Sequence, residues 1–160
     1  MVQSILTLGY DVAVVADSDA QDKFSDADAE QLRKSGVPVV MWSGNTSIEE
    51  RVFLDLPWEA VIKSVDCAVT LNGDRDRLLD QITTQFGGGF DRDIASWEDT
   101  PELRKAIGKA AKHDKTVWFK RIAFAETWAH IISPYLDQTA MAEKDFVKKL
   151  ADLRSWIDRE

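Results

Sequence analysis

The sequence contains few of the residues that build disulfide frameworks and zinc sites. Its 160 residues include one cysteine, Cys67, and two histidines, His113 and His130. A single cysteine excludes an internal disulfide and fits a reducing cytoplasm. Neither histidine has a cysteine or aspartate at zinc-ligand spacing, and no histidine is near Cys67 in sequence. We therefore expect neither histidine to bind metal, and we expect Cys67 to be a small buried residue rather than a nucleophile.

Long apolar runs and a positive net charge are also missing. No apolar run approaches the roughly 20 residues that a membrane span requires, and the N-terminus lacks the basic start and apolar core of a signal peptide. The net charge of −8 argues against a generally basic nucleic-acid-binding surface. A nuclease stays compatible with this charge, because an active site that holds metal ions is locally acidic. The segment "FGGGF" is not followed by Lys-Ser or Lys-Thr, so it is not a P-loop.

The first half of the chain alternates between strand and helix signals. Residues 12–16 and 37–42 are short apolar runs, which are typical of buried parallel strands. Residues 26–35 are expected to form a helix with an aspartate N-cap, and further helices are expected near residues 48–56 and 58–65. This alternation predicts an α/β fold in which helices flank a parallel sheet with right-handed crossovers.

The second half is expected to be mostly helical. Helical spacing covers residues 74–85, 101–112, 123–133 and 140–158, whereas 115–120, "KTVWFK", suits a strand or an exposed loop. We expect one domain over residues 1–136, with a C-terminal helix within residues 137–160 that packs on it. The apolar stripe of that helix consists of Phe146, Leu150, Leu153 and Ile157.

Two carboxylates follow the first predicted strand directly. Asp17 and Asp19 lie at its carboxyl end, which is where ligands collect in a parallel α/β sheet. On a chain that is still extended, residues i and i+2 point the same way, and two such carboxylates repel unless a cation lies between them. Glu49 and Glu50 begin the helix after the second strand and are expected near the same edge. The spacing therefore suits a Mg²⁺ site, although acidic residues can also solvate a strand end or complement a helix dipole.

One locally basic stretch, "KHDKTVWFKR", lies in the second half of the chain. Its cations are expected either to contact phosphates or to form a solvated helix face. Two tryptophans of this half, Trp118 and Trp128, are expected to pack in the core rather than to stack on bases. The basic residues in and beside the stretch are Lys109, Lys112, Lys115, Lys120 and Arg121.

Three segments together resemble the Toprim nuclease domain of the OLD (overcoming lysogenization defect) family. They are "LGYDVAVVADSDA", "GVPVVMWSGNTSIEERVFLDLPWEAV" and "KTVWFKRIAFAETWAHIISPYL". The resemblance covers most of the chain and implies a metal-dependent DNA endonuclease module, normally coupled to an ABC-type ATPase domain. It implies that Mg²⁺ or Mn²⁺ binds, with two metal ions in the full protein, and it suggests a role in phage defence. DNA and an ATPase domain, in the same protein or in trans, are the implied partners, and a homodimer is possible.

The resemblance also implies roles for individual residues. Asp17 and Asp19 match the Toprim D-x-D motif as metal ligands and catalytic residues, and Glu49, rather than Glu50, matches the glutamate that opens the following helix. Lys120 is the first choice for the catalytic lysine and Lys115 the second. Toprim domains carry a further glutamate on a strand ahead of the D-x-D strand. Residues 1–16 contain no glutamate, so the chain is expected to lack that first strand and to show weak or no nuclease activity alone.

Two other function classes stay open. One is a noncatalytic dimerisation or docking module, in which the stripe of the C-terminal helix makes the contact; an ordinary core helix would show the same stripe. The other is an aspartate-dependent phosphotransferase of the haloacid-dehalogenase type, which also begins with D-x-D after a strand. That motif normally has Thr or Val two residues after the second aspartate, where this chain has Gln21, so the phosphotransferase is the less favoured class.

Overall fold

The computed structural model describes residues 2–89, 91–113 and 118–159. It has a mixed α/β fold that is mostly helical, with a small parallel sheet. By contacts the chain divides into a strand unit, Met1–Ser47 with Asp145–Glu160, and a helical unit, Ile48–Lys144. The sequence predicted a division at residue 136, and that domain boundary stays a prediction. In the described part of the chain, no helix is long and apolar enough to cross a membrane.

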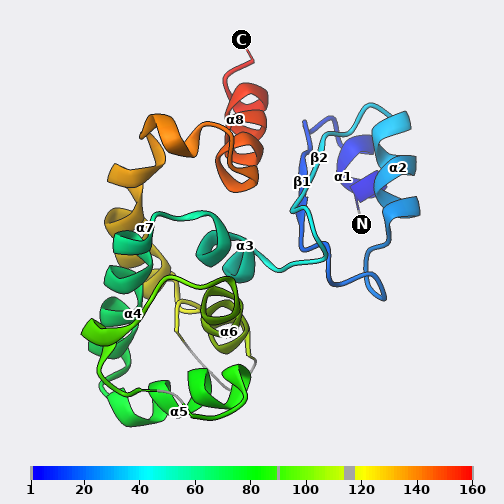
Figure 1. Ribbon diagram of the computed structural model, residues 1–160. Coiled ribbons are helices and arrows are strands. Elements are labelled where there is room, and N and C mark those ends of the chain that lie inside the picture. The colour runs from blue at the N-terminus through cyan, green and yellow to red at the C-terminus, as the bar shows by residue number, and fades with distance from the viewer. Residues whose placement is uncertain (1, 90, 114–117, 160) are drawn as a thin grey trace. The chain divides into compact units, whose positions relative to one another are not determined.

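The strand unit contains a parallel strand pair, β1 and β2 (Figure 1). Its register pairs Val14 with Val39 and Ala16 with Met41, so the predicted parallel pairing is confirmed. Within the described residues the sheet has these two strands, and the larger Toprim-like sheet stays a prediction. The elements of this unit are α1 (Val2–Thr7), β1 (Val14–Ala16), α2 (Asp26–Lys34), β2 (Val39–Met41) and α8 (Asp145–Ile157).

Helix α2 forms the crossover between the two strands. Ala29 of α2 is fully buried and clusters with Val39 and Met41 of β2. The predicted aspartate N-cap is wrong, because Ser25 caps the helix: its hydroxyl accepts from the backbone N–H of Asp28, and the Asp28 carboxylate accepts from the backbone N–H of Ser25. This reciprocal pair satisfies two backbone donors that a helix start otherwise leaves open. The crossover is therefore fixed at its first turn.

Helix α8 is joined to the end of β2. The backbone N–H and the hydroxyl of Ser43 donate to the Asp145 carboxylate, at 2.8 and 2.7 Å. The rings of Trp42 and Phe146 lie 5.7 Å apart. The predicted apolar stripe is buried at Phe146, but Ile157 at the other end of the helix is 63% exposed. The stripe therefore belongs to the core only where it begins.

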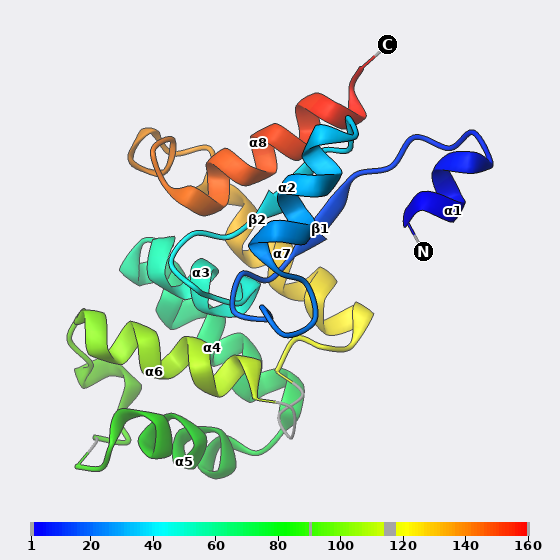
Figure 2. The ribbon, with the colours of Figure 1, turned by 90° about the vertical axis from the view of Figure 1, so that its right-hand side faces the viewer.

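The helical unit is built from five α-helices in the described residues (Figure 2). Figure 2 shows α5 lying alongside α6, and α3 also packs on α6. The predicted helix at 58–65 continues to Asn72, where Gly73 ends it in a left-handed conformation (φ +68°). The bounds are α3 (Ile48–Asp55), α4 (Trp58–Asn72), α5 (Arg75–Phe86), α6 (Pro101–Lys112) and α7 (Ile122–Leu136).

An aromatic cluster forms the centre of the helical unit. Trp128 of α7 stacks between two phenylalanines, with ring centroids 4.1 Å from Phe119 and 5.7 Å from Phe53. Trp118 packs edge-on against Phe53 and is 1% exposed. The two indole N–H groups donate to Gln81 and to Ser64, at 2.9 and 2.8 Å. The predicted core role of Trp118 and Trp128 is confirmed. In the segment 115–120, residues 118–120 form a turn, and 115–117 lie outside the described residues.

Helices α3 and α6 approach closely because α6 has a glycine at the contact. A Cβ atom added to Gly108 would lie 2.7 Å from the backbone Cα of Glu50. Real Cβ atoms essentially never make such a contact, so a larger residue would force the helices apart. Arg104 of α6 fixes the end of α3, since it donates to the carbonyl oxygens of Phe53 and Leu56 at 3.0 and 2.7 Å. The glycine contact at the first turn and the Arg104 contact at the end together hold α3 against α6.

Candidate functional site

The two predicted metal-binding aspartates lie directly after β1. The strand ends at Ala16, and Ser18 and Asp19 form a turn. The prediction assumed that the chain stays extended through Asp19, so that the side chains of Asp17 and Asp19 point the same way. The chain instead turns before Asp19, and this turn sets the direction of the Asp19 side chain. Asp17 and Asp19 are both half-buried, and the Oδ2 atom of Asp19 has no access to solvent. The D-x-D motif is thus at the carboxyl end of a parallel strand, as predicted, on a turn rather than on an extended segment.

Ser18, between the two aspartates, joins the loops that follow the two strands. Its backbone N–H donates to the carbonyl oxygen of Thr46 at 3.1 Å, and its hydroxyl accepts from the backbone N–H of Thr46 at 2.9 Å. Both residues are buried. Buried hydrogen bonds of this kind are costly to break, because each lost partner leaves a desolvated polar group. The carboxyl ends of β1 and β2 are therefore held together at the D-x-D motif.

Gln21 supports the same turn from the other side. Its Nε2 atom donates to the carbonyl oxygen of Ser18 at 2.9 Å, and its Oε1 atom accepts from the backbone N–H of Asp26 at 3.0 Å. One amide side chain thus connects the D-x-D turn to the first turn of α2. The sequence reasoning used Gln21 only as a departure from the phosphotransferase motif and missed this role. An amide four residues after the D-x-D start and just before a helix cap is the signal that could have found it.

The loop after β2 needs an unusual backbone. Gly44 and Asn45 both have positive φ, +83° and +56°, a region that favours glycine and tolerates asparagine. The Thr46 hydroxyl donates to the carbonyl oxygen of Ser43 at 3.0 Å. This tight turn brings Thr46 back to Ser18, so the residues "SGNT" explain why the two loops meet.

The two glutamates of α3 have different environments in the helical unit. Glu50 is buried against Gly108, and its Oε2 atom lies 3.4 Å from Lys112 Nζ. Glu49 is half-buried, and among the described residues it forms no hydrogen bond or ion pair. Glu50 is therefore committed to the contact between α3 and α6. The predicted convergence of Glu49 with Asp17 and Asp19 stays a prediction, because Glu49 belongs to the helical unit and the aspartates to the strand unit.

The first-choice catalytic lysine, Lys120, closes the end of α6. Its Nζ atom donates to the carbonyl oxygen of Lys112 at 2.7 Å, and its side chain is exposed. A cation at the last carbonyl groups of a helix is favourable, because it complements the helix dipole. The second choice, Lys115, lies outside the described residues. An ammonium group has three N–H donors, so the hydrogen bond to the Lys112 carbonyl does not by itself prevent a phosphate contact.

The donor chemistry of the D-x-D turn fits a hard divalent cation. Mg²⁺ is commonly held by one or two carboxylates and completes its shell with water or phosphate oxygens, and Asp17 and Asp19 supply two carboxylates. Across residues 2–89, 91–113 and 118–159, no group of three or more His, Cys, Asp or Glu side chains is placed to hold a metal. The three-ligand set of Asp17, Asp19 and Glu49 therefore stays a prediction.

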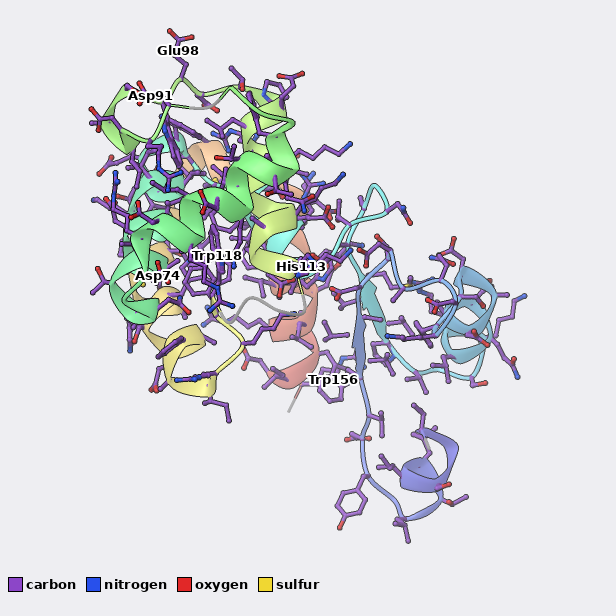
Figure 3. The ribbon with its side chains drawn as sticks, turned by 90° about the horizontal axis from the view of Figure 1, so that it is seen from below. Asp74, Asp91, Glu98, His113, Trp118 and Trp156 are labelled. Atoms are coloured by element: carbon purple, nitrogen blue, oxygen red, sulfur yellow. The ribbon has the colours of Figure 1, made fainter. Side chains whose placement is uncertain are left out.

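Two other predicted residues have clear places in the structure. Cys67 of α4 is 7% exposed, so the prediction that it is buried is confirmed. Burial raises the pKa of its thiol, which keeps the thiol protonated and unreactive. His113 follows the last residue of α6 and is exposed (Figure 3).

No protein-family model, no curated protein and no solved structure matches this chain. The site therefore has to be interpreted from its own residues.

Proposed function

We propose that this chain is a divalent-metal-dependent DNA endonuclease module of the OLD type, with a Toprim-like site at the carboxyl end of β1. One observation carries the proposal. Two carboxylates follow directly on a parallel strand, and the serine between them is hydrogen-bonded to the loop that follows the neighbouring strand. This arrangement fixes two oxygen donors at the sheet edge where ligands bind in α/β folds.

The aspartates act as the binding groups in this proposal. Asp17 and Asp19 would hold Mg²⁺ or Mn²⁺, and Glu49 is the expected third ligand. A bound divalent cation supplies Lewis-acid stabilisation of the charge that develops as a phosphodiester is cleaved. The hydrogen bonds of Ser18 and Gln21 hold the turn, so that the carboxylates need little rearrangement when the ion binds.

Lys120 would complement the negative charge of the DNA phosphate. Its ammonium group now neutralises the end of α6 through the Lys112 carbonyl, and a phosphate oxygen is a stronger acceptor than a carbonyl oxygen. In the OLD family this module works with an ABC-type ATPase domain, so we propose an ATPase partner, in the same protein or in trans, acting in the cytoplasm.

Plasmid nicking tests the proposal. Supercoiled plasmid is incubated with the chain and Mg²⁺ or Mn²⁺, and open-circular product is measured over time. We expect weak or no nicking by the chain alone, and any nicking should depend on the metal and be lost in Asp17→Ala and Asp19→Ala. Exposed or half-exposed carboxylates at a strand end add little to stability, so both variants should stay folded by circular dichroism.

Asp22→Ala is the matched control. Asp22 is exposed, lies three residues after Asp19, and forms no hydrogen bond or ion pair within the described residues. Its replacement removes the same charge and should leave nicking unchanged. Nicking that survives in Asp17→Ala and Asp19→Ala, or that disappears equally in Asp22→Ala, would reject the proposed site.

A further inference from the structure

The helical unit contains a polar pocket that none of the proposed cleavage residues line. It has a volume of about 250 Å³, and α5, the end of α4 and residues 118–124 surround it. Two guanidinium groups line it, from Arg77 of α5 and from Arg121, the residue that precedes α7. This volume is below that of pockets for drug-sized ligands, so it suits a small charged group.

Arg121 is held in place by an aromatic ring. Its guanidinium carbon lies 5.2 Å from the centre of the Phe124 ring, and Phe124 also lines the pocket. Among the described residues, Arg121 forms no ion pair with a carboxylate. Stacking on a ring leaves the edge of a guanidinium, which carries its N–H donors, available for an oxyanion. Arg121 is therefore oriented by an apolar contact and keeps its hydrogen-bonding capacity.

Amide groups add donors to the two arginines. Asn72 and Gln81 both line the pocket. The Asn72 amide nitrogen donates one N–H to the carbonyl oxygen of Ala68 at 2.8 Å, and its second N–H is the one that could serve the pocket. The Oε1 atom of Gln81 accepts from the indole N–H of Trp118 at 2.9 Å, and this leaves the Gln81 amide nitrogen as a donor. Trp118, labelled in Figure 3, is nearly fully buried, so the indole fixes Gln81 to a rigid part of the core. Donors thus reach the pocket from three separate segments of the chain.

Among the described residues that line the pocket, the one carboxylate is already used by a helix. Asp74, also labelled in Figure 3, caps α5 by accepting from the backbone N–H of Arg77 at 3.0 Å. Arg121 forms no ion pair with a carboxylate among the described residues, so it brings a cationic group to the pocket in a chain whose net charge is −8. A local positive charge attracts anions even though the chain as a whole is acidic.

We propose that this pocket binds a phosphate group, carried by a small ligand or by the end of a nucleic acid strand. Arginine forks match phosphate oxygens with paired hydrogen bonds, and donors from several directions suit a tetrahedral oxyanion better than a planar carboxylate. The proposal goes beyond the cleavage site, since it involves none of Asp17, Asp19, Glu49 or Lys120. It does not depend on nuclease activity.

An NMR titration of the whole chain tests the proposal with three probes. They are inorganic phosphate, a nucleoside 5′-monophosphate and a short single-stranded oligonucleotide with a 5′-phosphate. We expect at least one probe to shift the Trp118 indole N–H signal in a saturable way. Arg121→Ala should weaken that binding about tenfold or more, as the loss of a charge-assisted hydrogen bond does. The probe that binds most tightly identifies the source of the phosphate.

Lys105→Ala is the charge-matched control. Lys105 is exposed on α6 and does not line the pocket, so its loss should change affinity less than twofold by removing one distant charge. Arg121→Lys keeps the charge but loses the fork and should bind with intermediate affinity. Absence of a saturable Trp118 shift with all three probes, or equal affinity in wild type and Arg121→Ala, would overturn the proposal. The wild-type titration decides the question even where a variant fails to fold.

Discussion

The strand unit and the helical unit are stabilised in different ways. The largest fully buried side chains described include Phe53, Leu79, Ile82, Ile107 and Trp118, and every apolar member of this group belongs to the helical unit. The strand unit contributes only Ser47 to it. Instead, the strand unit holds its loops with polar side chains, such as Ser18 against Thr46 and Ser43 against Asp145.

This difference suggests that the helical unit supplies most of the stability, whereas the strand unit fixes the geometry of the candidate site. Apolar burial contributes roughly 25 cal/mol per Å² and has no direction, so the helical unit gains stability from its aromatic core. Hydrogen bonds contribute less net free energy but have strict geometry. They therefore fix the geometry of the loops at the ends of the two three-residue strands, where Asp17 and Asp19 lie. Changes in the helical core should lower stability, and changes in the strand-unit loops should act locally.

Trp128→Ala should have the largest effect. Trp128 is 8% exposed and stacks on Phe119 and Phe53, and removing a core aromatic side chain costs about 3–5 kcal/mol. Urea unfolding followed by the remaining tryptophan fluorescence measures the loss. Glu126→Ala, an exposed change on the same helix, should stay within about 0.5 kcal/mol of wild type. Equal small effects of both changes would show that the aromatic cluster does not stabilise the helical unit.

Ser43→Ala should have a smaller and more local effect. It removes the hydroxyl that donates to Asp145 and keeps the backbone donor, which should cost about 1 kcal/mol. Hydrogen exchange should become faster in peptides covering β2 and α8 and should stay unchanged in α4–α7. Ser35→Ala, at the exposed end of α2, is the control. A uniform increase in exchange rate across both units would contradict the view that changes in the strand-unit loops act locally.

The ion pair of Arg104 and Asp99 should give the smallest effect, visible mainly in acid. Hydrogen bonds from Arg104 hold the pKa of the Asp99 carboxyl below its ordinary value of 3.8. The unfolded chain therefore binds a proton at higher pH than the folded chain does. The stabilisation is present above pH 3.8 and is lost as the pH falls through the lower folded-state pKa. The stability difference between wild type and Asp99→Asn should shrink over that range. A difference that stays constant in acid would show that the carboxyl has an ordinary pKa.

Much of the secondary structure could be predicted from the sequence, because its periodic signals are strong. The two apolar runs, the helix at 26–34 and the parallel pairing follow from alternation and from stop signals such as Gly36. Helix α4 extends beyond its predicted end because the apolar pattern after Val65 is carried by small residues, Cys67 and Ala68, which pack at 7% and 0% exposure. A local pattern does not reveal how closely neighbouring helices approach.

The candidate site could be predicted only at its centre. The position of Asp17 and Asp19 at a strand end follows from the run before them. The contact of Ser18 with Thr46 joins residues that are 28 positions apart, so spacing does not reveal it. The support from Gln21 is local, because Gln21 lies three residues after Ser18. The choice of Glu49 over Glu50 as a ligand stays a prediction, and the packing of Glu50 against Gly108 has no local signal in the sequence. Tertiary contacts decide the environment of such residues, and sequence spacing alone does not predict it.

Manganese binding at the D-x-D turn tests the central claim most directly. Mn²⁺ broadens NMR signals near its binding site, so a titration of the chain locates the ion without requiring cleavage. We predict selective broadening of the amide signals of residues 17–20 and of Thr46, whose backbone N–H donates a hydrogen bond to Ser18. The broadening should disappear in Asp17→Asn with Asp19→Asn and remain in Asp22→Asn. Broadening spread evenly over the acidic surface, or retained at residues 17–20 in the double variant, would contradict a metal site at the end of β1.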